Sequence, residues 1–171
     1  MKKLLFEELI LENREEFKEK LIEISEKLGI KPDDLMLVFY IETAAAKYKV
    51  INHRIQNSIK ATGYIQFMPA TAKELGTTTT ALKNMSNVEQ LNWVYKYLLP
   101  YKGKMKSVTD VYLAVFFPAA IGKSDDWVLQ TPSLSAAKIA AANPGYAKNG
   151  QIKVKYVKEK VLSFIPKGYE I

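Results

Sequence analysis

The chain has 171 residues, of which 48% are hydrophobic and 25% are charged, which is the balance of an ordinary globular protein. The 25 basic and 18 acidic residues give a net charge of +7. This charge favours an anionic partner such as nucleic acid, a membrane surface or a bacterial wall polymer, or it belongs to a protein that is basic without such a partner. Because cysteine is absent and His53 is the single histidine, we expect no disulfide, no metal site and no cofactor.

The N-terminal part of the chain has the pattern of an amphipathic helix. Residues 3–28 repeat apolar side chains at helical spacing, and Gly29 is placed to end the helix. The pattern is interrupted near Glu12 and Asn13. We expect residues 1–30 to pack as an N-terminal helix on a core formed by residues 31–171, and a partner-binding helix is the alternative.

The first residues begin like a signal peptide, but glutamates from Glu7 onward interrupt any apolar region. No stretch approaches the ~20 apolar residues of a membrane span. We therefore expect a protein that is made in soluble form without a signal peptide, does not span a membrane and is a monomer.

Residues 35–41 form a run of seven apolar or aromatic residues that ends at one carboxylate, Glu42. Pro32 and the acidic residues after it suit the first turn of a helix, so we predict a buried helix over residues 32–46. Burial raises the pKa of a carboxyl group, and a carboxyl that is still protonated near neutral pH can act as a general acid. The alternative is a structural carboxylate that pairs with a basic residue or caps a backbone.

The rest of the chain alternates helical patterns with short loops. After a polar loop over 47–62, we predict a short extended segment near 63–68. Helices are predicted over 69–75, from near 81, and over 87–99, 107–117, 135–142 and 154–164, where Ser, Thr, Pro and Gly supply start and stop signals. With six to eight helices and little strand, the sequence predicts one mainly α domain.

Three segments in order carry the most information about function. They are Tyr-Ile-Glu-Thr-Ala at 40–44, Ala-Thr-Gly-Tyr-Ile-Gln-Phe-Met-Pro-Ala-Thr-Ala-Lys-Glu-Leu-Gly at 61–76, and Val-Tyr-Leu-Ala-Val-Phe-Phe-Pro-Ala-Ala at 111–120. Together they resemble the soluble lytic transglycosylase domain of the lysozyme-like superfamily, over about residues 33–122. The positions of the middle segment that fall in register are Gly63, Gln66, Pro69, Thr71, Ala72 and Gly76.

The resemblance implies a lysozyme-like fold and an enzyme that cleaves the β-1,4 bond between N-acetylmuramic acid and N-acetylglucosamine in peptidoglycan. It implies that Glu42 acts alone, first as general acid and then as general base. The sugar's own N-acetyl group would stabilise the positive charge that develops at the anomeric carbon. The product, an anhydro sugar or a hydrolysed one, stays open. The expected partner is thus a peptidoglycan strand, and the expected setting is the cell wall, as a lysis or virion protein.

The resemblance also implies a set of substrate-binding residues. Gln66 is expected to face the substrate, with holding the backbone of its own loop as the alternative. Tyr64 is expected either to stack on a sugar ring or to pack in the protein. Thr43 is expected either to form a hydrogen bond near Glu42 or to pack. The full set of expected substrate-binding residues is Thr43, Gly63, Tyr64, Gln66, Phe67, Tyr112 and Phe116.

The third segment departs from the family pattern, because Phe116-Phe117-Pro118 replaces Tyr-Asn-Ala. Tyr112, one helical turn earlier, is the candidate for the missing hydroxyl.

His53 is expected at the surface, and Trp127 is the candidate sugar platform. The departure motivates one alternative, a catalytically inactive glycan-binding or structural part of a phage tail or secretion device. The positive net charge leaves another, a basic nucleic-acid-binding protein. Because the lysines are spread along the chain and no recognition motif occurs, we expect no nucleic-acid partner.

Overall fold

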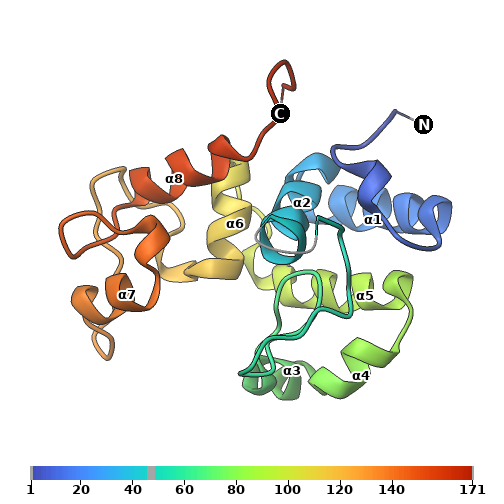
Figure 1. Ribbon diagram of the computed structural model, residues 1–171, viewed down its shortest axis with the longest axis horizontal. Helices are drawn as coiled ribbons and strands as arrows, with labels where there is room; N and C mark the ends of the chain where they lie inside the picture. The colour runs from blue at the N-terminus through green and yellow to red at the C-terminus, as the bar shows by residue number, and fades with distance from the viewer. Residues whose placement is uncertain (1, 46–48, 171) are drawn as a thin grey trace. The chain divides into compact units, whose positions relative to one another are not determined.

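The computed structural model describes residues 2–45 and 49–170, and the chain is mainly helical there, which confirms the predicted class (Figure 1). In these ranges eight α-helices alternate with loops and single turns, and β-structure is limited to isolated bridges. None of the described helices has both the length and the apolar character that a membrane span requires. The chain divides into two compact units, residues 2–103 and 104–170. The expected division into an N-terminal helix (residues 1–30) and a core (residues 31–171) stays a prediction.

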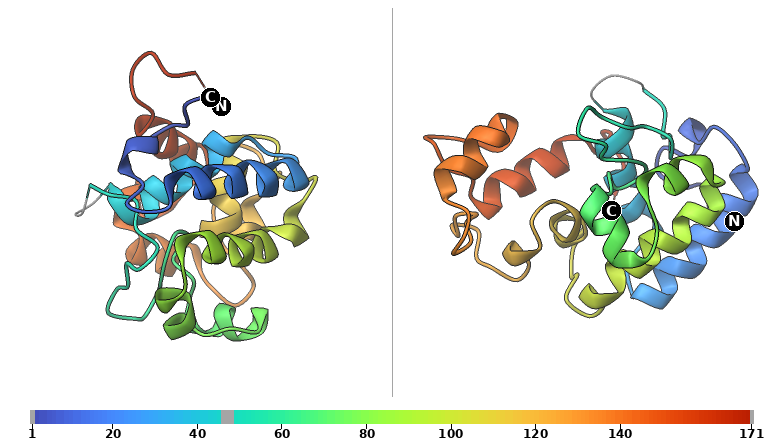
Figure 2. Two further views of the ribbon diagram at one scale, coloured as in Figure 1. Left: turned by 90° about the vertical axis from the view of Figure 1, so that its right-hand side faces the viewer. Right: turned by 90° about the horizontal axis from the view of Figure 1, so that it is seen from below.

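The first unit opens with a 3₁₀ turn, η1 (Glu7–Leu9), and helix α1 (Arg14–Leu28). Asn13 separates them in the left-handed conformation, with φ 50°, where the apolar pattern is interrupted. Gly29, with φ 71°, ends α1 because glycine adopts this conformation without a steric penalty. Helix α1 packs along α5 (Asn87–Leu98) and against α2 (Pro32–Phe39), so it belongs to the core of the first unit (Figures 1 and 2).

The predicted buried helix is present. Helix α2 begins at Pro32 and continues directly into a π-turn, η2 (Tyr40–Ala44). Residues 35–39 are completely buried, as expected of a helix that is apolar on every side. Each such side chain contributes about 1.5–3 kcal/mol by leaving water. Residue 46, the expected end of this helix, and residues 47–48 of the expected loop lie outside the described residues.

Helices α3 (Pro69–Leu75), α4 (Thr79–Asn84) and α5 follow, close to their predicted bounds. The hydroxyls of Thr78 and Ser86 accept hydrogen bonds from the third amide of α4 and of α5. Such caps satisfy amides that would otherwise lack partners, and each typically stabilises a protein by about 1 kcal/mol. The local signals were therefore sufficient to place these helices.

The segment predicted to be extended near 63–68 is instead a tight turn. Thr62 and Phe67 exchange two backbone hydrogen bonds, of 3.0 and 2.8 Å, and residues 63–66 reverse the chain between them. Gly63 and Gln66 are left-handed, with φ 84° and 54°. The β-prone composition of this segment is overridden because its aromatic and aliphatic side chains turn inward to the core.

His53 was expected at the surface, but it is 2% exposed. One ring nitrogen lies 2.8 Å from the Met85 carbonyl oxygen, and the other lies 3.6 Å from the Glu12 carboxylate. Burial lowers the pKa of His53. The polar loop around it had suggested solvent, but this ring packs at 5.8 Å from the ring of Tyr64.

The second unit contains α6 (Val108–Phe116), α7 (Ala136–Ala142) and α8 (Val154–Ser163). The Ser107 and Ser135 hydroxyls cap α6 and α7. Helix α6 packs on α8, and α8 packs on a 3₁₀ turn, η5 (Pro144–Tyr146). Figure 1 shows α6 and α8 meeting within this unit.

Asp34 is the conspicuous polar group of α2. It is 6% exposed, and its Oδ1 atom has no hydrogen-bond partner among the described residues. Burial raises the pKa of Asp34 to about 6, because a buried carboxylate loses hydration. The folded protein therefore holds a proton on Asp34 in a range where the unfolded chain has already released it.

We expect Asp34→Asn to remove this pH dependence. The pKa is raised on folding, so the stability that protonated Asp34 contributes below about pH 4 is lost as the pH rises through 6. The variant should gain roughly 2–3 kcal/mol relative to wild type between pH 4 and pH 7. Urea unfolding at stepped pH measures the difference. Asp125→Asn, at an exposed position, is the control, and a wild type and Asp34→Asn that track each other across this range would contradict the prediction.

Candidate functional site

Glu42 occupies the centre of the π-turn η2. The Ala45 amide donates to the Tyr40 carbonyl oxygen at 2.9 Å, which is the spacing of five residues that defines this turn. Single π-turns within α-helices are uncommon and are often found at functional sites. The Thr43 hydroxyl donates to the Phe39 carbonyl oxygen at 2.8 Å and so binds the turn to the end of α2. The one acidic side chain of the turn is therefore held on a rigid element.

The Glu42 side chain is half-buried. Within the described part of the chain, no group donates a hydrogen bond to it and no cation pairs with it. Burial alone raises the pKa of Glu42 to about 7. A carboxyl that keeps contact with solvent and is about half protonated at neutral pH can both donate and accept a proton.

Tyr97 lies near Glu42 and was missed in the sequence. Burial raises the pKa of Tyr97, and the neighbouring Tyr101 and the negative charge of Glu42 raise it further. The ring of Tyr97 is edge-on to Phe67 at 6.2 Å and tilted against Tyr101 at 6.1 Å. Aromatic residues recur every fourth position at Trp93, Tyr97 and Tyr101, and this stripe is the signal that could have revealed the residue.

The turn at residues 63–66 is fixed by a buried amide side chain, that of Gln90, which is completely buried. Gln90 Oε1 accepts from the Tyr64 amide at 2.9 Å, and Nε2 donates to the carbonyl oxygens of His53 and Leu82 at 2.9 and 2.8 Å. Gly63 leaves room for this side chain, since a Cβ atom there would lie 2.3 Å from Gln90 Oε1. Gly63 is thus required by packing as well as by its backbone conformation.

Three expected substrate contacts of this unit have structural roles. Gln66 Nε2 donates to the Gly63 and Ile55 carbonyl oxygens, at 2.9 and 3.3 Å, which is the loop-holding alternative. Tyr64 is 1% exposed and stacks on Phe39 at 4.7 Å, so it packs and offers no face to a sugar. The Thr43 hydroxyl, besides donating to Phe39, accepts from the Asn52 amide at 3.3 Å.

Phe67 is also buried, and its contact with Tyr97 connects the turn to the surroundings of Glu42. Tyr112 and Phe116 belong to the second unit, where they stack at 5.5 Å. Trp127, the expected sugar platform, is half-buried there beside Phe117 and Lys123. In residues 2–45 and 49–170, no three His, Cys, Asp or Glu side chains gather as metal ligands would.

We expect Gly63→Ala to destabilise the protein by more than about 2 kcal/mol, because the new Cβ must displace a buried, fully bonded amide. Gly76→Ala is the matched control: Gly76 has φ 94°, but a Cβ there would meet nothing within 4 Å, so it isolates the backbone penalty of about 1–2 kcal/mol. Denaturant unfolding of both variants gives the comparison. Equal losses in the free energy of unfolding would show that the Gln90 side chain does not exclude a Cβ atom at position 63.

We also expect one carboxyl group to titrate near pH 7 in the folded protein and to be absent from Glu42→Gln, because burial withholds hydration from the Glu42 carboxylate. Carboxyl carbon NMR shifts followed from pH 3 to pH 9 would show it. Glu42→Gln should also be the more stable protein above pH 7, where the wild type must bury a charge. If every glutamate titrates below pH 5, Glu42 is an ordinary solvated side chain.

Comparison with known proteins adds no further constraint on this site. No family model matches the sequence, and no curated protein and no solved structure matches the chain. The likeness to lytic transglycosylases therefore rests on the three segments at 40–44, 61–76 and 111–120.

Proposed function

We propose that this protein cleaves the glycan strands of peptidoglycan at the β-1,4 bond between N-acetylmuramic acid and N-acetylglucosamine, with Glu42 as the single general acid and base. The observation that carries the proposal is the Glu42 carboxyl, which is half-buried on a π-turn, has no cationic partner in the described ranges and has a pKa raised to about 7. The order of the three sequence segments supports the choice of substrate.

In the first step, Glu42 donates its proton to the glycosidic oxygen. The bond from the anomeric carbon to that oxygen breaks, and its electron pair leaves with the oxygen. The carbonyl oxygen of the sugar's own N-acetyl group forms a bond to the anomeric carbon, so no second carboxylate is needed. This scheme is one of the exceptions to the usual pair of carboxyl groups in glycoside cleavage.

In the second step, the Glu42 carboxylate takes a proton from the attacking hydroxyl. That hydroxyl is the sugar's 6-hydroxyl or a water molecule, and its oxygen bonds to the anomeric carbon as the acetamido oxygen leaves. The first choice gives a 1,6-anhydro sugar and the second gives hydrolysis. A group with a pKa near 7 suits both steps, because it changes protonation state at little cost near neutral pH.

We expect Glu42→Gln to reduce the release of soluble muropeptides from purified sacculi by at least about 100-fold, since the amide cannot transfer the proton. The wild-type rate should fall as the pH rises above about 7, because the acid is then already ionised. Glu74→Gln, at an exposed position on α3, is the matched control. Mass spectrometry of the released muropeptides identifies the product. Equal rates for wild type and Glu42→Gln would eliminate the proposed acid.

A second candidate function is a glycan-binding or structural component without catalysis, as in a phage tail or secretion device. The observation that favours it is the third segment, in which Phe116 and Phe117 carry no hydroxyl or amide. Wild-type protein that sediments with sacculi but releases no soluble fragments would support this candidate over the enzyme.

A further inference from the structure

The second unit contains a cavity of about 210 Å³ between η5 and α8. This volume is smaller than the roughly 300–1,000 Å³ of sites for drug-sized ligands, so it suits a single ring. Two tyrosines, two lysines, one glutamate and a serine supply its functional groups: Tyr146, Lys148, Tyr156, Glu159, Lys160 and Ser163. Gly145 and Ala147 complete the wall. The wall therefore combines aromatic faces and a hydroxyl with two cationic groups and one carboxylate.

The aromatic part of the wall is held from behind by residues that the sequence analysis had selected for sugar contact. The Tyr146 hydroxyl shares a hydrogen bond of 2.6 Å with the Tyr112 hydroxyl, and its ring lies 4.9 Å from that of Phe116. Tyr156, on α8, is covered on one side by Lys148, whose Nζ atom is 4.7 Å from the ring centre. The Tyr146 ring is thus held in place before any ligand arrives.

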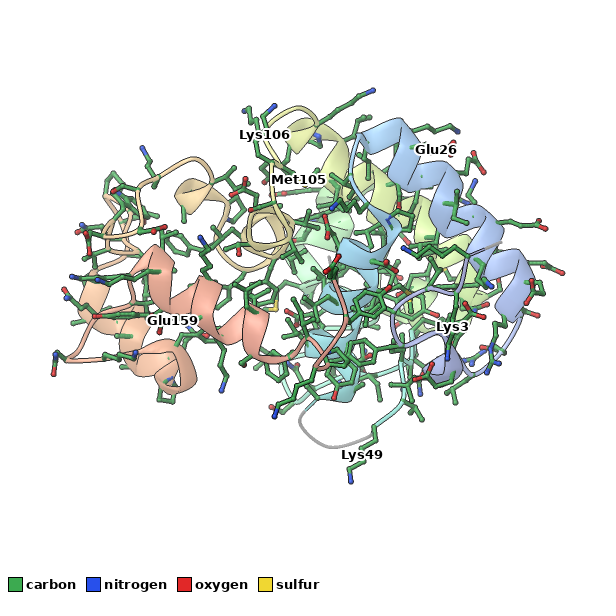
Figure 3. The ribbon with its side chains drawn as sticks, turned by 90° about the horizontal axis from the view of Figure 1, so that it is seen from above. Lys3, Glu26, Lys49, Met105, Lys106 and Glu159 are labelled. Carbon is green, nitrogen blue, oxygen red and sulfur yellow. The ribbon has the colours of Figure 1, made fainter. Side chains whose placement is uncertain are left out.

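The cationic part of the wall is only partly neutralised. Lys148 Nζ pairs with Glu159 Oε2 at 3.2 Å, and Glu159 is labelled on α8 in Figure 3. Lys160 Nζ lies 5.7 Å from the ring centre of Phe164 and has no carboxylate partner among the described residues. Residues 104–170 hold ten lysines and five acidic residues, so this unit carries +5 of the total +7. An anionic ligand is favoured at this cavity.

We propose that this cavity binds one pyranose ring that carries a carboxylate. The Tyr146 and Tyr156 rings take the apolar face of the sugar, and Lys160 pairs with the carboxylate while Ser163 accepts from a sugar hydroxyl. The inference rests on the proposed function, in which the available ligand is the N-acetylmuramic acid residue of the wall strand. A uronic acid of another wall polymer has the same chemistry, so both sources are tested.

The experiment is an NMR titration of the full chain carrying Glu42→Gln, which separates binding from cleavage. N-acetylmuramic acid and N-acetylglucosamine form the central comparison, because they differ only by the lactyl group with its carboxylate. We expect N-acetylmuramic acid to shift the signals of residues 145–148 saturably and to bind about fivefold or more tightly than N-acetylglucosamine, as one partly exposed ion pair provides. Glucuronic acid binding as tightly as N-acetylmuramic acid would assign the site to uronic acids as well.

Lys160→Gln should reduce the affinity for N-acetylmuramic acid to that for N-acetylglucosamine. Lys158→Gln, an exposed lysine on the same helix outside the cavity wall, should leave the affinity unchanged. Gly145→Leu fills open space, since a Cβ there would meet nothing within 4 Å, and it should abolish binding in a folded protein. Equal affinity for the two amino sugars, equal effects of the two lysine variants, or no saturable shift would overturn the proposal.

The two proposals fail separately. Cleavage of sacculi by the wild type together with no sugar binding at residues 145–148 would remove the cavity proposal alone. Saturable binding of N-acetylmuramic acid together with an inactive wild type would remove the proposed catalysis and keep this site.

Discussion

One buried amide, that of Gln90, holds the loop region of the first unit together. It bonds to the backbone of three segments that are distant in the sequence, at His53, Tyr64 and Leu82. An amide buried without these bonds would cost several kcal/mol, so the arrangement is stable only when all three segments are in place. The absence of a side chain at Gly63 is what lets the amide approach the turn.

The surroundings of Glu42 follow from this constraint. The turn that Gln90 fixes presents Phe67 to Tyr97, and Tyr97 lies within reach of the Glu42 charge. The Thr43 hydroxyl and the Gln66 amide donate hydrogen bonds to backbone carbonyl oxygens of the same region. Nearly every polar side chain here is thus used to satisfy backbone groups, while in the described ranges Glu42 has no hydrogen-bond partner. Burial raises the pKa of this carboxyl to about 7, so its ionised form costs stability, and groups with such shifted pKa values are concentrated at functional sites.

The sequence was informative where local forces decide the structure. Serine and threonine caps, Pro32 and Pro69 at first turns, and Gly29 and Gly76 at helix ends placed the helices, because each acts on neighbouring backbone groups. Long-range packing decided the rest. The turn at 63–66, the burial of His53 and Tyr64, and the place of α1 in the first unit depend on partners dozens of residues away. The spacing of apolar residues along the chain does not identify those partners.

The π-turn at Tyr40–Ala44 has a consequence for how this segment can vary. Successive side chains of an α-helix are about 100° apart around its axis, and a wider turn delays that rotation for everything beyond it. Deleting one residue here would restore the regular helix and swing the acidic side chain to another azimuth, even if every neighbour kept its identity. The segment should therefore tolerate substitutions of similar size better than it tolerates the insertion or deletion of a residue.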